Sequence, residues 1–161
     1  MIGPGEAELL GRVAVATGLG LLVGAERELM AKPAGMRTHA LVALGAAAFT
    51  VAGFAVLNIG DPLQMRADVG RIAAQVVSGI GFLGAGIIIL HQGRVRGVTT
   101  AAELWGAAAI GVLCGLGLVF VATGTTILIL VIVAGARPIE SWMERFRREH
   151  HVEPDVEDEM S

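Results

Sequence analysis

A run of 38 residues with one charge decides the fold: VTTAAELWGAAAIGVLCGLGLVFVATGTTILILVIVAG, residues 98–135, in which only Glu103 is ionisable at neutral pH. A membrane-spanning helix needs about 20 consecutive apolar residues, because the hydrocarbon core is about 30 Å thick. The run is therefore about two spans long. Glycine permits a tight reversal, and Cys114-Gly115-Leu116-Gly117 lies at the middle. We expect helices over about residues 99–115 and 118–136.

Three more apolar runs precede this one. They cover about residues 9–25, 39–59 and 72–90, and Arg12 is the only Lys, Arg, Asp or Glu within them. The composition agrees, since 17% of the chain is charged, against about 25% in average globular proteins. A soluble helical bundle is the alternative, and it would have to cover each run with protein. We predict an all-α, polytopic transmembrane bundle of about five spans, residues 1–136.

Basic residues give the predicted orientation, because cytoplasmic flanks of membrane helices collect Lys and Arg. With five spans, nine basic residues fall on one side of the membrane and three on the other, whereas four spans give seven and five. The smaller set is Arg12, Arg66 and Arg71. We therefore expect the N-terminus outside and the C-terminus in the cytoplasm.

Composition and motifs also exclude several classes of protein. Cys114 is the only cysteine, so an intrachain disulfide is impossible, and the four histidines have no zinc-site spacing. A net charge of −3 argues against a nucleic-acid-binding protein, which usually has an excess of basic residues. The GxGxxG match at residues 79–84 lies inside an apolar run rather than between a strand and a helix. We predict no metal, no cofactor and no enzymatic activity.

Small residues at helical spacing predict where the helices pack, because close backbone approach drives helix association in lipid. Four glycines fall within eight residues of the third run, where packing is the favoured interpretation and a bent or unwound segment is the alternative. Small residues line one face of three helices as follows: Ala16, Gly20 and Gly24 in the first, Gly45 and Gly53 (with Phe49 between them) in the second, and Ala107, Gly111 and Gly115 in the fourth. The third helix carries Gly79, Gly81, Gly84 and Gly86.

Polar side chains gather at the predicted inner ends of the helices. Glu26 lies near the end of the first helix, Arg37 before the second, and Thr99, Thr100 and Glu103 at the start of the fourth. Glu103 lies about one turn inside the bilayer, where an unpaired acid is costly. We expect Glu103 to pair with Arg37, with Glu26 competing for the guanidinium. The cluster is either a cation or proton site, a charge-sensitive switch, or a structural clasp between helix ends.

A second polar layer is predicted at the outer end of the third helix. Asp68 and Arg71 are three residues apart, and Gln75 and Ser78 follow on the same side. The charged pair is interpreted as an ordinary helix start, with Asp68 near the positive end of the helix dipole. Gln75 and Ser78 are deeper, and we expect them to join a hydrogen bond between helices.

The last 25 residues differ from the rest. Residues 137–151 carry Ile139, Trp142, Met143 and Phe146 at helical spacing among arginines, which predicts an amphipathic helix on the inner membrane surface. A contact face for another subunit is the alternative. Residues 152–161 are acidic, contain Pro154 and are expected to be disordered.

Three blocks of sequence resemble the MgtC/SapB family of bacterial inner-membrane proteins. They are GAERE (24–28) with AGMRTH (34–39), RIAAQVVSGIGFLGAG (71–86), and RGVTTAA (96–102) followed by Trp105, Ala109 and Gly111. Glu103 departs from the pattern, which has a small or hydroxyl residue there. Longer members of the family carry a soluble C-terminal domain.

This resemblance implies a function. Family members are linked to growth in low Mg²⁺ and to survival of pathogens inside macrophages, and some bind other membrane proteins, including the F-type ATP synthase. We therefore expect a regulatory membrane protein that binds partner proteins in the bilayer. The small-residue faces of the helices also permit a homodimer. The alternative is a small cation or proton transporter or channel that uses Glu26, Arg37 and Glu103.

Overall fold

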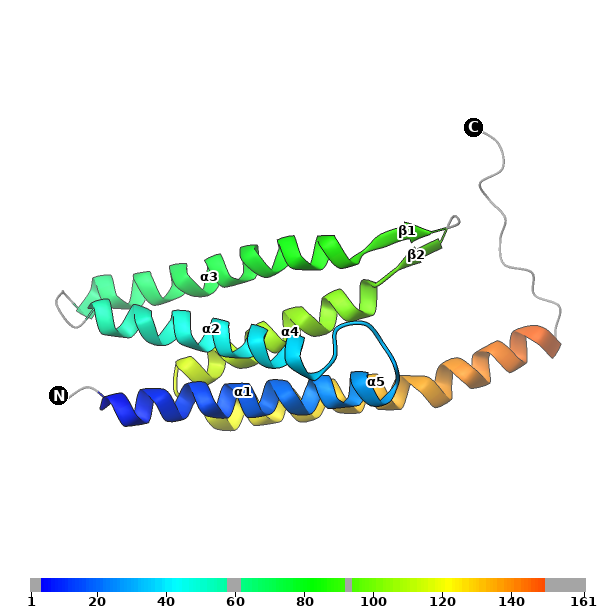
Figure 1. Cartoon of the computed structure of the whole chain (residues 1–161), viewed down its shortest axis with the longest axis horizontal. Helices are drawn as coiled ribbons and strands as arrows, with labels where there is room; N and C mark the ends of the chain where they lie inside the picture. Colours follow the sequence, from blue (N-terminus) through cyan, green and yellow to red (C-terminus); the bar gives the residue numbers. More distant parts are fainter. Residues whose placement is uncertain (1–3, 58–61, 92–93, 150–161) are drawn as a thin grey trace, which may run out of the picture. The chain divides into compact units, whose positions relative to one another are not determined.

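The structure is a computed structural model that describes residues 4–57, 62–91 and 94–149. Five of the helices within these ranges are long and apolar enough to cross a membrane, which confirms the predicted fold class. Figure 1 shows the elements in chain order: α1 (Glu6–Leu29), α2 (Met36–Leu57), α3 (Pro62–Ile87), β1 (Ile89–His91), β2 (Arg94–Arg96), α4 (Val98–Gly115) and α5 (Val119–Glu149).

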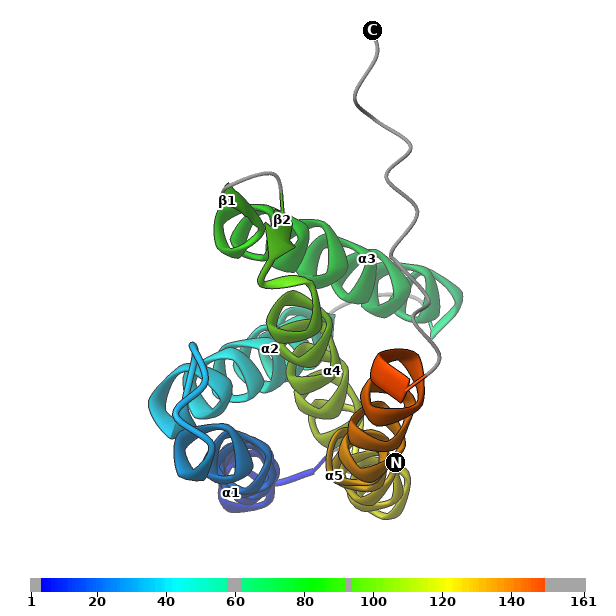
Figure 2. The ribbon, with the colours of Figure 1, turned by 90° about the vertical axis from the view of Figure 1, so that its right-hand side faces the viewer.

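The chain divides into two compact units, residues 1–129 and 130–161. In the first unit α4 contacts α1, α2 and α3, and Figure 2 shows it among these three helices. The fully buried positions of this unit are mostly small, and alanine is the commonest of them. Small side chains let the backbones of α1, α2 and α4 approach closely, which is the packing that membrane helices favour.

Glycines lie at the closest of these contacts. A Cβ atom on Gly24 of α1 would lie 2.5 Å from the Cα of Met36 and 2.8 Å from the carbonyl oxygen of Gly35. A Cβ on Gly20 would lie 2.7 Å from the carbonyl oxygen of His39. Backbone atoms cannot rotate away as a side chain can, so any larger residue here has to separate α1 from the start of α2.

The reversal between α4 and α5 falls where the sequence suggests it. Gly117 has φ +81°, its N–H donates to the carbonyl of Cys114 at 2.9 Å, and the N–H of Leu118 donates to the carbonyl of Leu113 at 2.9 Å. These two bonds form a Schellman motif, which ends a helix with a left-handed residue. Arg12 of α1 donates to the carbonyl of Gly115 at 3.2 Å and so ties α1 to this turn.

A short hairpin replaces the end of the third predicted span, which was expected to remain helical to residue 90. α3 ends at Ile87, and β1 and β2 pair antiparallel, with Leu90 opposite Val95. The strands have three residues each, too few for an alternating pattern to show in the sequence. Gly97, at φ +90°, then starts α4, and a Cβ there would collide with the carbonyl of Ile87.

The second unit continues α5 from residue 130 to Glu149, through Pro138. Ile139, Trp142, Met143 and Phe146 are all exposed, and the rings of Trp142 and Phe146 stack with centroids 5.8 Å apart. Residues 137–149 are therefore helical with an apolar set of side chains. Their location on the inner membrane surface stays a prediction, and the acidic residues 152–161 lie outside the described ranges.

Candidate functional site

A buried ion pair joins α1 to α4. Arg27 lies in the last turn of α1 and Glu103 in the second turn of α4, and both side chains are about 5% exposed. Nη1 of Arg27 donates to Oε1 of Glu103 at 3.0 Å, and Nη2 donates to Oγ1 of Thr100 at 2.5 Å. One guanidinium therefore holds the carboxylate and the hydroxyl of the same α4 turn.

His39 brings α2 into the same site. Its side chain is fully buried, and Nε2 lies 3.9 Å from Oε2 of Glu103. Nδ1 lies 3.1 Å from the carbonyl oxygen of Gly35, a contact that requires a proton on Nδ1. In the neutral ring Nε2 then has a lone pair that faces the carboxylate. We call Arg27, His39, Thr100 and Glu103 the ionic cluster.

The expected pairing of Glu103 with Arg37 is wrong. Arg37 is exposed, while Arg27 occupies the place beside the carboxylate. The reason is the face of each helix. Arg27 follows Gly20 and Gly24 on the buried face of α1, whereas Arg37 lies on the side of α2 that carries the exposed Leu41. The face of the helix, and not only the depth along the membrane, therefore decides which arginine pairs with Glu103.

The small-residue pattern contains the signal that sequence reasoning missed. His39 precedes Ala43, Ala46 and Thr50 on the buried face of α2, as Arg27 follows the glycines of α1. Polar residues that continue such a stripe at a spacing of three or four are candidates for burial. The stripes indicate His39 on α2, and on α1 they indicate Arg27 together with Glu28, which is exposed.

Of the other residues proposed for this cluster, one belongs to it and two do not. Thr100 is buried in the cluster, whereas Thr99 is exposed. Glu26 is half-buried beside Arg27 in α1. Glu28 lies in the same turn, and its Oε2 accepts a hydrogen bond from the backbone N–H of Met36 at 3.1 Å, which fixes the turn between α1 and α2.

Comparison with known proteins places this arrangement in a family. The model of the MgtC family matches residues 13–142, which include the whole ionic cluster and nearly all of the five helices. This chain belongs to the MgtC family. The MgtC-family match extends into α5 as far as Trp142, past the boundary between the two units.

Curated relatives agree with the family model. The chain is similar to Protein MgtC of Brucella abortus strain 2308, with 49% identity over 126 residues, 78% of this chain and 50% of the relative. It is similar to Protein MgtC of Salmonella typhimurium strain LT2, with 53% identity over 112 residues, 70% of this chain and 45% of the relative. This MgtC-family chain thus spans about half the length of the curated relatives it matches. No solved structure matches it.

The second polar layer of this MgtC-family chain differs from expectation. Ser78 donates to the carbonyl of Ala74 at 3.2 Å, so its hydroxyl is bonded within α3 rather than to another helix. Arg71 and Gln75 are exposed near the start of the apolar part of α3. The side chain of Asp68 lies outside the described part of the structure.

The glycines divide into two groups. Gly111 lies against Ala46 and Gly115 against Thr50, so that α4 meets α2 without intervening side chains, as α1 meets α2 at Gly20 and Gly24. In α3 a Cβ on Gly84 would reach only the Cβ of Ala101, at 3.5 Å. Around Gly79, Gly81 and Gly86 nothing among the described residues lies within 4 Å of such an atom. Packing among the described residues of this unit therefore does not require these three glycines.

Proposed function

We propose that this chain is a non-catalytic regulator in a bacterial inner membrane, which acts by binding other membrane proteins when Mg²⁺ is scarce or the surroundings are acid. Family membership supports a role of this kind, since the curated relatives are named as proteins rather than as enzymes. The proposal concerns the membrane part of the family alone, because the chain spans half of those relatives.

The burial of Glu103 is the main observation that supports the proposal. A transport site has to exchange its ion with water, yet the carboxylate of Glu103 is about 5% exposed and is held by Arg27. Removing one partner of a buried ion pair costs about 3–5 kcal/mol, because the other charge is left buried and uncompensated. The cluster therefore has the properties of a clasp that holds the ends of α1, α2 and α4 together.

A surface for partner helices is available on α3. A Cβ added to Gly81 or Gly86 would meet nothing within 4 Å among the described residues, and Phe82 beside them is 81% exposed. Glycine on an outward face allows another helix to approach closely, and an aromatic ring adds contact area. This surface fits a membrane-embedded partner, such as the membrane sector of the F-type ATP synthase or a second copy of the chain.

The proposed orientation places the loop between α1 and α2 in the cytoplasm. Lys32 lies in that loop, and the hairpin of β1 and β2 with Arg96 lies at the same end of residues 1–129 (Figure 1). Reporter fusions at Lys32 and after residue 149 are expected to report the same, cytoplasmic, face. Reporters on opposite faces contradict the orientation.

Proton movement is a second candidate, and one observation favours it. Oε2 of Glu103 and Nε2 of His39 are buried 3.9 Å apart, and neither has a hydrogen-bond partner among the described residues. A single added proton on either atom would let the two atoms approach to hydrogen-bond distance. A proton carrier at the mouth of the bundle would use this pair rather than Arg37.

Ion flux separates the two candidates. The purified chain is reconstituted into liposomes that contain a pH or Mg²⁺ indicator, and the flux is compared with empty liposomes. The regulator predicts no flux above that background. A flux that Glu103→Gln abolishes and the exposed control Glu6→Gln leaves unchanged contradicts the regulator and supports the carrier.

Partner binding is tested on the expected target. Inverted membrane vesicles with the F-type ATP synthase are compared with and without the chain for ATP-driven proton uptake, and the synthase is purified under mild detergent. The regulator predicts altered uptake and co-purification of the chain. Unaltered uptake without co-purification excludes this partner.

A further inference from the structure

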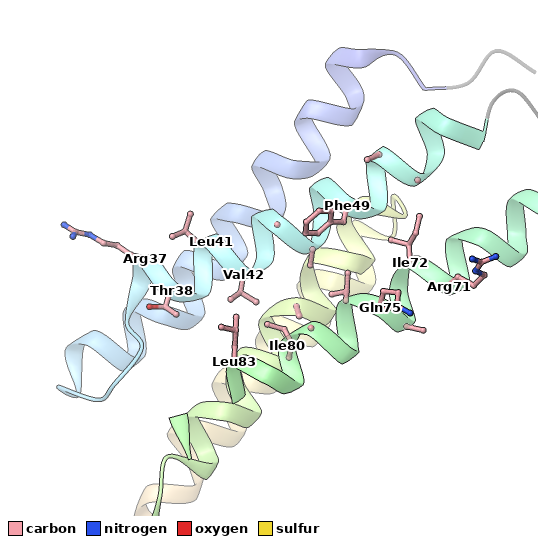
Figure 3. Close-up of a pocket in the computed structure, with 18 residues that line it drawn as sticks. Arg37, Thr38, Leu41, Val42, Phe49, Arg71, Ile72, Gln75, Ile80 and Leu83 are labelled. Carbon is pink, nitrogen blue, oxygen red and sulfur yellow. The ribbon is translucent and has the colours of Figure 1, made fainter. Parts of the chain in front are cut away.

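A long groove separates α2 from α3 on the side away from the ionic cluster. It has a volume of about 1120 Å³ and runs from Arg37 at one end to Arg71 at the other (Figure 3). Figure 3 shows Val42 of α2 opposite Ile80 and Leu83 of α3. Between the two arginines its lining is almost entirely aliphatic or aromatic, apart from Thr38 and Gln75.

The rim of the groove faces the surroundings of the bundle. Leu41 is 65% exposed, Phe49 67% and Leu83 48%, and all three line the groove. α2 and α3 are both long and apolar enough to cross a membrane, so the groove opens towards lipid rather than water. Whatever occupies it has to be apolar along most of its length.

The length of the groove suits extended hydrocarbon chains. From Arg37 to Gly53 it follows α2 for about 24 Å, at 1.5 Å per residue. The hydrocarbon part of one leaflet is about 15 Å thick, so acyl chains that start at the Arg37 end lie within this length.

The Arg37 end of the groove supplies a charge for a headgroup. Arg37 makes no hydrogen bond or ion pair to any described residue, in contrast to Arg12 and Arg27. Its side chain extends beyond the end of α2, past the apolar lining, with Thr38 beside it (Figure 3). A guanidinium at the end of an apolar groove complements a phosphate group at the end of hydrocarbon chains.

We propose that the groove between α2 and α3 binds an anionic phospholipid, with its phosphate at Arg37 and its acyl chains along Leu41, Val42, Gly45 and Ile80. One leaflet is about 15 Å thick in its hydrocarbon part, so the chains reach about ten residues along α2, to the region of Gly45 and Ala46. The lipid fills the space that side chains leave open between the two helices. This site is independent of the regulatory function proposed above.

Native mass spectrometry of the detergent-solubilised chain tests the site. Phosphatidylglycerol and phosphatidylcholine with the same acyl chains are titrated separately, and bound lipid is counted from the mass. We expect phosphatidylglycerol to bind about fivefold more tightly, as for one basic residue near an anionic headgroup. Arg37→Gln is expected to remove this preference, while the matched loop variant Lys32→Gln keeps it.

A second pair of variants tests the groove itself. Gly45 lines the groove and Gly81 does not, yet nothing among the described residues lies within 4 Å of a Cβ on either one. Gly45→Leu fills the groove and is expected to weaken binding of both lipids about tenfold, whereas Gly81→Leu has no such effect. Arg37 is exposed, so Arg37→Gln tests the proposal even where Gly45→Leu does not fold.

The same spectra give the results that overturn the proposal. Equal binding of the two lipids by the wild-type chain would contradict a headgroup site at Arg37. A preference for phosphatidylglycerol that survives Arg37→Gln would contradict it as well. Equal loss of bound lipid in Gly45→Leu and Gly81→Leu would show that the lipid does not bind in the groove. Dimers that Gly45→Leu abolishes, in place of bound lipid, assign the groove to a second copy of the chain.

Discussion

Within residues 1–129 the two faces of α2 have opposite character. Towards α1 and α4 it meets glycine and alanine, and backbone lies on backbone at Gly24 and Gly111. Towards α3 it leaves a groove of about 1120 Å³ with an aliphatic lining. The face towards α1 and α4 also holds the buried ionic cluster. The groove towards α3 has Arg37 of α2 at one end and Arg71 of α3 at the other.

The difference shows what each kind of packing can support. A buried ion pair persists only where helices are held so close that its partners cannot separate and water does not enter. Glycine contacts hold the helices this close on the side of α2 that faces α1 and α4. On the α3 side the helix is held at fewer points, so lipid or another protein can reach it. The following predictions test this contrast, from the largest effect to the smallest.

Loss of the buried Arg27 guanidinium should have the largest effect on the free energy of unfolding. Arg27→Gln leaves Glu103 buried without its cation, and we expect a loss of about 3–5 kcal/mol in the free energy of unfolding. Arg37→Gln removes the same charge from an exposed position and should change it by less than about 0.5 kcal/mol. Unfolding of both variants in detergent measures the difference. Equal effects would mean that Arg27 is not the buried partner.

Glycine contacts should rank second. Gly111→Ala places a methyl group against the backbone of Ala43 and the side chain of Ala46, and we expect a loss of about 1–3 kcal/mol. Thermal unfolding of the purified chain reports this loss. A variant as stable as the wild type would show that α2 and α4 are farther apart than described.

Adjacent threonines provide a narrower comparison. Thr100→Val removes the hydroxyl that accepts from Arg27, with an expected cost of about 1–3 kcal/mol, because the buried donor loses its acceptor. Thr99→Val, at the neighbouring exposed position, should be close to neutral. The two unfolding curves are compared under the same conditions, and the reverse order would contradict the burial of Thr100.

The smallest effect is expected on the open face of α3. Gly81→Ala meets nothing among the described residues within 4 Å, and alanine favours a helix over glycine by about 1 kcal/mol. The isolated chain should therefore be unchanged or slightly more stable. A loss of stability in a monomeric preparation would show that α3 packs on a helix of the chain at this point.

Much of the fold could be predicted from the sequence, because its signals are local. The apolar runs give five helices, and Gly117 has the left-handed conformation at the expected reversal. The hairpin escaped prediction, because three-residue strands beside apolar residues look like the continuation of a helix. α3 also starts at Pro62, ten residues before the apolar run, since charged residues there are compatible with a helix outside the hydrocarbon core.

The contacts of the site were predicted less completely than the fold, because they depend on which face of each helix a residue occupies. Glu103 could be identified because it is the only charge in 38 residues, and its burial needs a partner. Choosing that partner requires the face of each helix, which the glycines of α1 and the alanines of α2 indicate. The open glycines of α3 could not be recognised as such, because a sequence does not show which small residues have neighbours.

A double-mutant cycle on Arg27 and Glu103 tests most directly whether the ionic cluster is a clasp. Arg27→Met, Glu103→Leu and the double variant are unfolded in the same detergent, and their free energies of unfolding are compared with the wild type. The clasp predicts that each single variant loses about 3–5 kcal/mol and that the double variant loses less than either, because no charge is left buried alone. Losses that simply add in the double variant would contradict it.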